Sequence, residues 1–313
     1  EHFPNETILK LVITIPEREN VIVDLLKNIL AELGIRNDRL VILGHKQSYM
    51  YYAVSQPKEL WANSVGLFEF DEMGLRYTNL TVDKRTIPYI VGADVHDLSD
   101  IMPYSVLQEK GDVKYMFLNT ANTMLHKKMV TTIYVTGKGF DQRWATDALK
   151  ELCNGRRVFR GQNLFNKGAA YAARMLTDRE KTKEFIFLDD DMLTSDISIR
   201  TYHNAKMHDV VLAKAGTLWS DIDESIDIIP DNEDEIQITD KNVLTRETRA
   251  HILSLSGFAV RDNKTTRFTV RIRFADQYTC IVTLKDNGFG EFYPSTNRIW
   301  ERYIKINGAD SKN

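Results

Sequence analysis

Three consecutive carboxylates, Asp189, Asp190 and Asp191, follow the apolar run from Phe185 to Leu188. An Asp-x-Asp pattern at the end of a strand is how sugar-nucleotide glycosyltransferases bind a divalent metal, because carboxylate oxygens are hard ligands. Nothing nearby supplies His or further carboxylates in a fixed geometry. A series of strand patterns follows, without the acceptor-binding segments that a transferase needs. The sequence therefore favours a solvated linker over a metal site, and a plain edge strand is the third alternative.

Glycines after a predicted strand indicate a second kind of chemistry, the binding of phosphate by backbone N–H groups. Gly137 and Gly139 flank Lys138 in VTGKGF, and Gly168 precedes Ala169 in the small-residue stretch NLFNKGAAYAA. Only glycine lets the backbone approach a ligand this closely. A Gly-x-Gly recurs in many turns, so the loop alone is a weak signal.

The other reactive residue types favour structural roles. His45 and His208 have no partner at a metal-ligand spacing, and Cys153 and Cys280 match neither a metal pattern nor a disulfide framework. The acidic segment 221–235 lacks the spacing of an EF-hand loop. We therefore assign no catalytic residue and no metal site.

The elements that position these residues fall into two classes. Up to about residue 183 the pattern alternates between helices and strands. The prediction is a strand at 11–16, a helix with an apolar face of Ile22, Leu25, Leu26, Ile29 and Leu33, a strand at 39–43, a hairpin at 64–82, an irregular stretch at 84–112, a helix at 113–126, a strand ending in the glycine loop, a helix capped by Asp141, a helix at 163–176, and a charged connector.

From Ile197 onward the pattern changes to short strands with alternating apolar residues. The predicted strands are ISIRTY, DVVLA, SIDII, EIQI, HILSLSGF, FTVRIRF and YTCIVTLKD. Seven such strands without helices are typical of a β-sandwich. The fold class is therefore an α/β module followed by an all-β module.

The order of these motifs resembles the 70-kDa heat-shock chaperones, which are built on the actin-like (ribonuclease H-like) ATPase fold. Their VITVP strand and their helix ending in AGL are similar to LVITIP and AELGI here, and their small-residue helix is similar to NLFNKGAAYAA. Their interdomain linker coincides with FIFLDDDMLTSDISI, and the DNQ stretch of their peptide-binding sandwich resembles IPDNEDEIQI. The resemblance implies an actin-like lobe, without its first lobe, followed by a substrate-binding sandwich.

The resemblance also implies ligands. The nucleotide would be ATP or ADP with Mg²⁺, bound by Gly137, Lys138, Gly139, Gly168 and Ala169, and a peptide would bind an apolar groove at Ile226, Ile236 and Ile238. The second phosphate hairpin falls at FEFDEMG, where only Gly74 is a glycine and three carboxylates would repel phosphate. Hydrolysis is therefore not expected, and nucleotide binding stays open. An equal alternative to the groove is that all three isoleucines face the core of the sandwich.

We expect a lobe at 1–183, a linker at 184–194, a sandwich at 195–305 and a tail at 306–313, within a longer protein. The expected function is a degenerate heat-shock-type scaffold or chaperone whose partner is a polypeptide segment or a protein. The alternatives are a metal-dependent glycosyltransferase and a residual actin-like ATPase. A net charge of -3 argues against nucleic acid, no apolar run is long enough for a membrane span, and two unpaired cysteines favour the cytoplasm.

Overall fold

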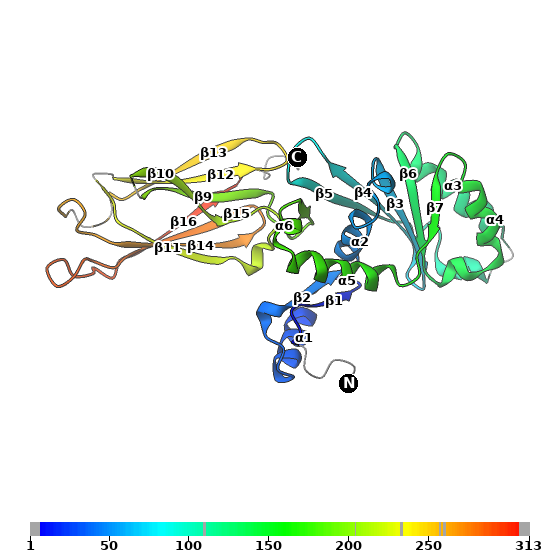
Figure 1. Ribbon diagram of the computed structural model, residues 1–313, viewed down its shortest axis with the longest axis horizontal. Helices are drawn as coiled ribbons and strands as arrows, with labels where there is room; N and C mark the ends of the chain where they lie inside the picture. The colour runs from blue at the N-terminus through cyan, green and yellow to red at the C-terminus, as the bar shows by residue number, and fades with distance from the viewer. Residues whose placement is uncertain are drawn as a thin grey trace. The chain divides into compact units, whose positions relative to one another are not determined.

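The computed structural model describes residues 7–108, 111–203, 205–231, 234–256, 258 and 261–306 (Figure 1). The chain divides into two compact units, Glu1–Phe187 and Leu188–Asn313. This division falls inside the stretch expected as a linker, 184–194. Most of the expected tail, and Asn232 and Glu233 of the DNED stretch, lie outside the described residues. Across these ranges, helices of the length and apolar character needed to cross a membrane are absent.

Unit 1 is mixed α/β, and its described residues form a two-stranded and a six-stranded sheet. The small sheet pairs β1 (Leu11–Ile15) in parallel with β2 (Leu40–Gly44), and α1 (Asn20–Glu32) connects them, as predicted. The large sheet has the order β7-β6-β3-β4-β5-β8. Its strands are β3 (Ser64–Asp71), β4 (Gly74–Asp83), β5 (Tyr89–Asp97), β6 (Val130–Thr136), β7 (Arg157–Arg160) and β8 (Phe185–Leu188).

Helices cover both faces of the large sheet (Figure 1). β3, β4 and β5 form an antiparallel meander, whereas β6 runs parallel to β3 and β7 parallel to β6. One face packs against α3 and α4 through a core that includes Phe68, Phe117 and Ala148, and the other packs against α2 and α5. The helices are α2 (His45–Val54), α3 (Val113–Leu125), α4 (Arg143–Leu152), α5 (Leu164–Thr177) and the short α6 (Arg179–Thr182).

The predicted apolar face of α1 is wrong in part. Only Val23 is buried, and Leu26 and Leu30 pack against the small core of β1 and β2. Four of the five residues of the predicted face are exposed, namely Ile22, Leu25, Ile29 and Leu33. A two-stranded sheet covers a narrower stripe of the helix than the sequence pattern offers.

Other local predictions differ from the structure for identifiable reasons. Asp141 does not cap α4, because its carboxylate pairs with Arg160 and the N-cap is Gln142. The stretch expected to be irregular contains β5, and β7 was not predicted. Residues 185–188 form edge strand β8, which is the third alternative given for this run and not the favoured linker. The Phe187 ring stacks on Tyr51 with centroids 4.0 Å apart.

Unit 2 consists of two antiparallel four-stranded sheets in its described part, with the orders β10-β9-β12-β13 and β11-β14-β15-β16. The strands are β9 (Ser195–His203), β10 (Lys206–Ala213), β11 (Asp223–Ile228), β12 (Glu235–Asn242), β13 (Thr248–Ser254), β14 (Phe268–Asp276), β15 (Thr279–Asp286) and β16 (Ile299–Lys305). One apolar core contains residues of both sheets, such as Ile199 and Val282. β16 is an eighth strand that the sequence did not predict.

The buried carboxylate of Asp286 should make the stability of unit 2 depend on pH. Asp286 is almost fully buried and accepts two hydrogen bonds from Arg261, at 3.0 and 2.9 Å, and one from the Thr296 hydroxyl at 2.6 Å. Burial acts to raise the pKa of Asp286, but these bonds and the backbone N–H of Gly288 outweigh it and lower the pKa to about 2. The unfolded carboxyl has a pKa of about 3.9.

The folded form therefore binds its proton at lower pH than the unfolded chain does. The stabilisation by Asp286 is complete above about pH 4 and should be lost as the pH falls from about 4 towards 2. Urea unfolding at a series of pH values checks this. Asp286→Asn should lower stability at pH 6 and flatten the acid decline, whereas Asp209→Asn on exposed β10 should keep the wild-type slope. An unchanged slope in Asp286→Asn would contradict the assignment.

Candidate functional site

The parallel strands β3 and β6 end at the same edge of the large sheet, with Glu69 in register with Thr136. The turn between β3 and β4 and the loop that begins at Gly137 therefore meet at this edge. The Lys138 ammonium lies 3.4 Å from the Glu72 carboxylate of that turn. We call this meeting point the strand-end site, and it contains Gly137, Lys138 and Gly139 of the residues expected to bind a nucleotide.

The two glycines of the loop pack against the protein's own chain. Gly137 has φ +102°, and a Cβ there would lie 2.7 Å from the carbonyl carbon of Phe70. A Cβ on Gly139 would lie 2.7 Å from Cγ of the Phe70 ring. Close contact with the end of β3 therefore explains both glycines.

Gly168 and Ala169 have a similar explanation on α5. A Cβ on Gly168 would lie 2.7 Å from the carbonyl carbon of Ser48 in α2. Ala169 is buried, and the Ser48 hydroxyl is 2.6 Å from that of Thr14 on β1. The small residues of α5 thus let two helices approach closely.

Three carboxylates lie at or beside the turn of the strand-end site. Glu69, Asp71 and Glu72 all lie on β3 or on the turn that follows it, and Asp71 accepts a hydrogen bond from the Met73 N–H at 2.9 Å. Carboxylates beside a bound phosphate would raise its energy, because like charges repel. Lys138 is already paired with Glu72.

His45 contacts two elements that are remote in sequence. Its Nδ1 lies 3.8 Å from Oε1 of Glu69, and its ring stacks on Phe165 with centroids 3.8 Å apart. The start of α2, the end of β3 and the start of α5 therefore meet at one half-buried side chain. The sequence suggested no partner for His45, because the three segments come together only in the fold.

These observations together test the expected nucleotide. The Cβ positions of Gly137, Gly139 and Gly168 point at protein atoms, so the missing side chains open no cradle for a ligand. Glu69, Asp71 and Glu72 add negative charge at the turn, and the nearby cations Lys138 and Arg160 are paired with Glu72 and Asp141. The expected set of residues does not fit ATP or ADP with Mg²⁺.

Comparison with known families covers nearly the whole chain. Residues 1–190 match the C-terminal model of a family of unknown function, DUF5716. The chain belongs to the DUF5716 C-terminal family. Residues 192–306 match a domain of unknown function, DUF8552. A search of curated proteins gives no match to the chain. Between the two matches lies residue 191, close to the boundary of the two units at Phe187 and Leu188.

The Asp run of this DUF5716 chain lies just after β8. The Asp190 N–H donates to the Asp189 carboxylate at 2.8 Å, and the Asp191 carbonyl accepts from the Trp219 N–H at 3.2 Å. Over the described ranges, His, Cys, Asp and Glu side chains form no group of three that could hold a metal ion. The run is therefore held by hydrogen bonds within the protein, one to a side chain and one between backbone groups.

The isoleucines expected to form a peptide groove face the core of unit 2 in this DUF5716 chain. Ile236 and Ile238 on β12 are 6% and 1% exposed, and both belong to the core that the two sheets share. Ile226 on β11 is half-buried and packs against the same core. The structure brings the three residues together, but inside the unit rather than on an accessible surface.

Proposed function

We propose that this DUF5716 chain is a degenerate heat-shock 70-kDa-like scaffold that binds an extended polypeptide of a partner protein and does not hydrolyse ATP. The observation that carries the proposal is the strand-end site, where protein atoms occupy the space behind each glycine and carboxylates surround the turn. We place this scaffold in the cytoplasm, a proposal that two free cysteines support.

The order of elements supports an actin-like lobe. An antiparallel meander of three strands is followed by two helix–strand units, in which β6 runs parallel to β3 and β7 parallel to β6. The small-residue helix α5 comes next, before α6 and β8. Two antiparallel sheets around one core then support a sandwich of the substrate-binding type. The alternative transferase and ATPase functions have no comparable support.

Edge strand β10 offers a surface for the polypeptide. Among the described strands it pairs with β9 alone, so a row of its backbone N–H and C=O groups is not used by this sheet. Met207 and Val211 are exposed on this strand, and Met207 lies opposite exposed Tyr202. An extended peptide could add a strand here, with backbone hydrogen bonds for affinity and alternate apolar side chains over Met207 and Val211.

The first prediction from this proposal concerns nucleotide. Titration of the chain with ATP and Mg²⁺ in a calorimeter should give no binding heat, and phosphate release should equal that of buffer. Saturable binding with turnover would contradict the proposal and restore the ATPase alternative.

The second prediction concerns the peptide. The chain should bind a fluorescent, extended, Leu-rich peptide in an anisotropy titration. The double variant Met207→Lys and Val211→Lys should weaken binding at least about tenfold, because it removes apolar contact area and adds charge. Both side chains are solvent-exposed, so its melting temperature should change little.

The matched control is Ile299→Lys with Tyr303→Lys, two exposed residues on β16, which is an edge strand of the other sheet. This variant should bind the peptide like the wild type. Equal losses in both variants, or no binding by the wild type, would rule out β10 as the docking strand.

A further inference from the structure

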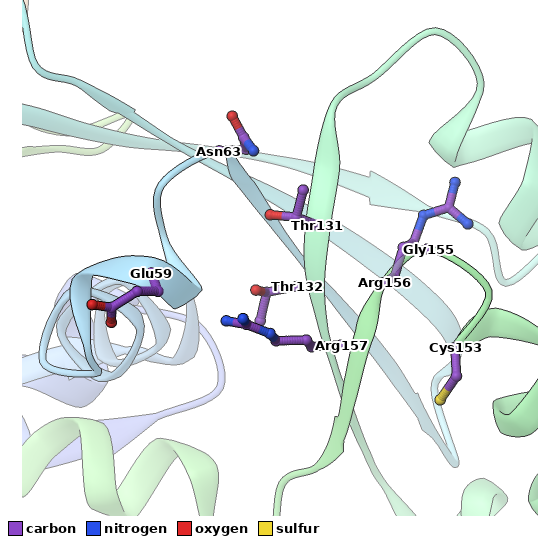
Figure 2. A pocket seen from close by; sticks show the side chains of 8 residues that line it. All are labelled: Glu59, Asn63, Thr131, Thr132, Cys153, Gly155, Arg156 and Arg157. Carbon is purple, nitrogen blue, oxygen red and sulfur yellow. The ribbon is translucent and has the colours of Figure 1, made fainter.

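A polar cavity lies at the edge of the large sheet opposite the strand-end site. It has a volume of about 500 Å³ and lies beside the first residues of β6 and β7 (Figure 2). Thr132, which lines it, stands five residues before Gly137, and five residues of strand span roughly 17 Å. The cavity is therefore a different site from the strand-end site, and its role does not depend on the proposed function.

Two threonine hydroxyls in this cavity have no hydrogen-bond partner in the described part of the protein. Thr132 is fully buried, Thr131 is half-buried, and neither Oγ1 is paired. Buried polar atoms are paired in most proteins, so an exception needs an explanation. Two neighbouring exceptions that line one cavity point to a polar occupant.

A β-bulge explains why consecutive residues reach the same cavity. Ser64 and Val65 of β3 lie opposite Val130 and Thr132 of β6, which leaves Thr131 as the extra residue. A bulge of this kind re-aims a side chain that would otherwise alternate to the other face. The local backbone thus places both hydroxyls at the cavity.

Two arginines give the cavity a positive charge. Arg157 is in register with Thr132, and Figure 2 shows its guanidinium and the Thr132 hydroxyl directed to the same side. Arg156 also lines the cavity, and Figure 2 shows its side chain directed away from that of Arg157. Neither guanidinium forms an ion pair with a described residue, although acidic residues outnumber basic ones in the chain, 44 to 41. Glu59 is the one carboxylate among the lining residues.

We infer that this cavity binds a small phosphate monoester whose remainder is rich in hydroxyl groups, such as a sugar phosphate. A guanidinium matches the oxygens of a phosphate group, and unpaired threonine hydroxyls can donate to them. The Glu59 carboxylate and the Asn63 amide are partners for sugar hydroxyls. The lining contains no aromatic side chain on which a base could stack, which argues against a nucleotide.

The test is calorimetric titration of the chain with glucose 6-phosphate, inorganic phosphate and glucose. Glucose 6-phosphate should bind more tightly than either of the other two. Arg157→Gln should weaken it about tenfold or more, since a charge-assisted hydrogen bond is lost. Thr132→Val should weaken it several-fold without lowering the melting temperature, because the hydroxyl has no protein partner to lose.

Arg143→Gln is the matched control. Arg143 is an exposed arginine at the first position of α4, whereas Cys153, which follows the last residue of this helix, lines the cavity. It should bind like the wild type. No binding of any probe at millimolar concentration, or unchanged affinity in Arg157→Gln, would overturn the site. Equal affinities for inorganic phosphate and glucose 6-phosphate would overturn the assigned ligand class.

Discussion

Replacing Ile236 by Asp should unfold unit 2 rather than selectively abolish peptide binding. The side chain is 6% exposed and lies in register with buried Leu253, inside the core of the two sheets. A carboxylate there has no cationic partner among the described core residues, and burying an unpaired charge costs several kcal/mol. Domains have only about 5–15 kcal/mol of stability in total. Circular dichroism melting should show loss of the cooperative transition of unit 2.

Ile252→Asp is the matched control, with the same exchange on neighbouring β13. Its side chain is 53% exposed and lies in register with Gln237, on the opposite face of the sheet from Ile236. Its free energy of unfolding should lie within about 1 kcal/mol of the wild-type value. If Ile236→Asp keeps the wild-type transition and loses only peptide binding, an accessible groove at Ile226, Ile236 and Ile238 must exist after all.

Gly168→Ala should destabilise unit 1, although Ala normally stabilises a helix relative to Gly by about 0.5–1 kcal/mol. The added Cβ would overlap the carbonyl group of Ser48, and backbone atoms of a packed helix cannot move aside as a side chain can. Overpacking of this kind costs about 1–3 kcal/mol, occasionally more, and here α2 and α5 must separate. Denaturant unfolding of unit 1 should therefore show a lower midpoint, with or without ATP.

Gly92→Ala on β5 is the matched control, since a Cβ there meets no heavy atom within 4 Å and its φ is not positive. That variant should be neutral or slightly stabilised. A Gly168→Ala protein as stable as the wild type would mean that the helices do not pack as described and would reopen a ligand role for Gly168.

Local patterns predicted much of the fold. The hairpin of β3 and β4, helix α3 and the pair β14 and β15 were all predicted within a few residues, because each has an unbroken apolar period between turn residues. β7 was not predicted, and β8 was foreseen only as the third alternative for residues 185–188, beside a linker and a metal site. Each has only four residues, too few for a period, and both depend on neighbouring strands for their hydrogen bonds.

The candidate sites were harder to predict from sequence. Gly137 and Gly168 are glycines because of contacts with Phe70 and Ser48, which lie 67 and 120 positions away, so nothing next to them in sequence distinguishes packing from phosphate binding. The cavity at Thr131 and Thr132 gave no signal either, since a bulge is a property of two paired strands. Charge was the exception, because the carboxylates of FEFDEMG argue against phosphate binding from the sequence alone.

Strand β8 has a consequence for how the protein is made. β8 pairs with the edge of β5, and its Phe185 and Phe187 rings pack against those of Tyr51, Trp61 and Tyr89. Synthesis proceeds from the N-terminus, so a nascent chain ending at residue 183 has an unpaired β5 edge beside aromatic rings that lack their contacts with β8. Unit 1 can therefore complete its large sheet only after β8 has left the ribosome, and by then translation of unit 2 has begun.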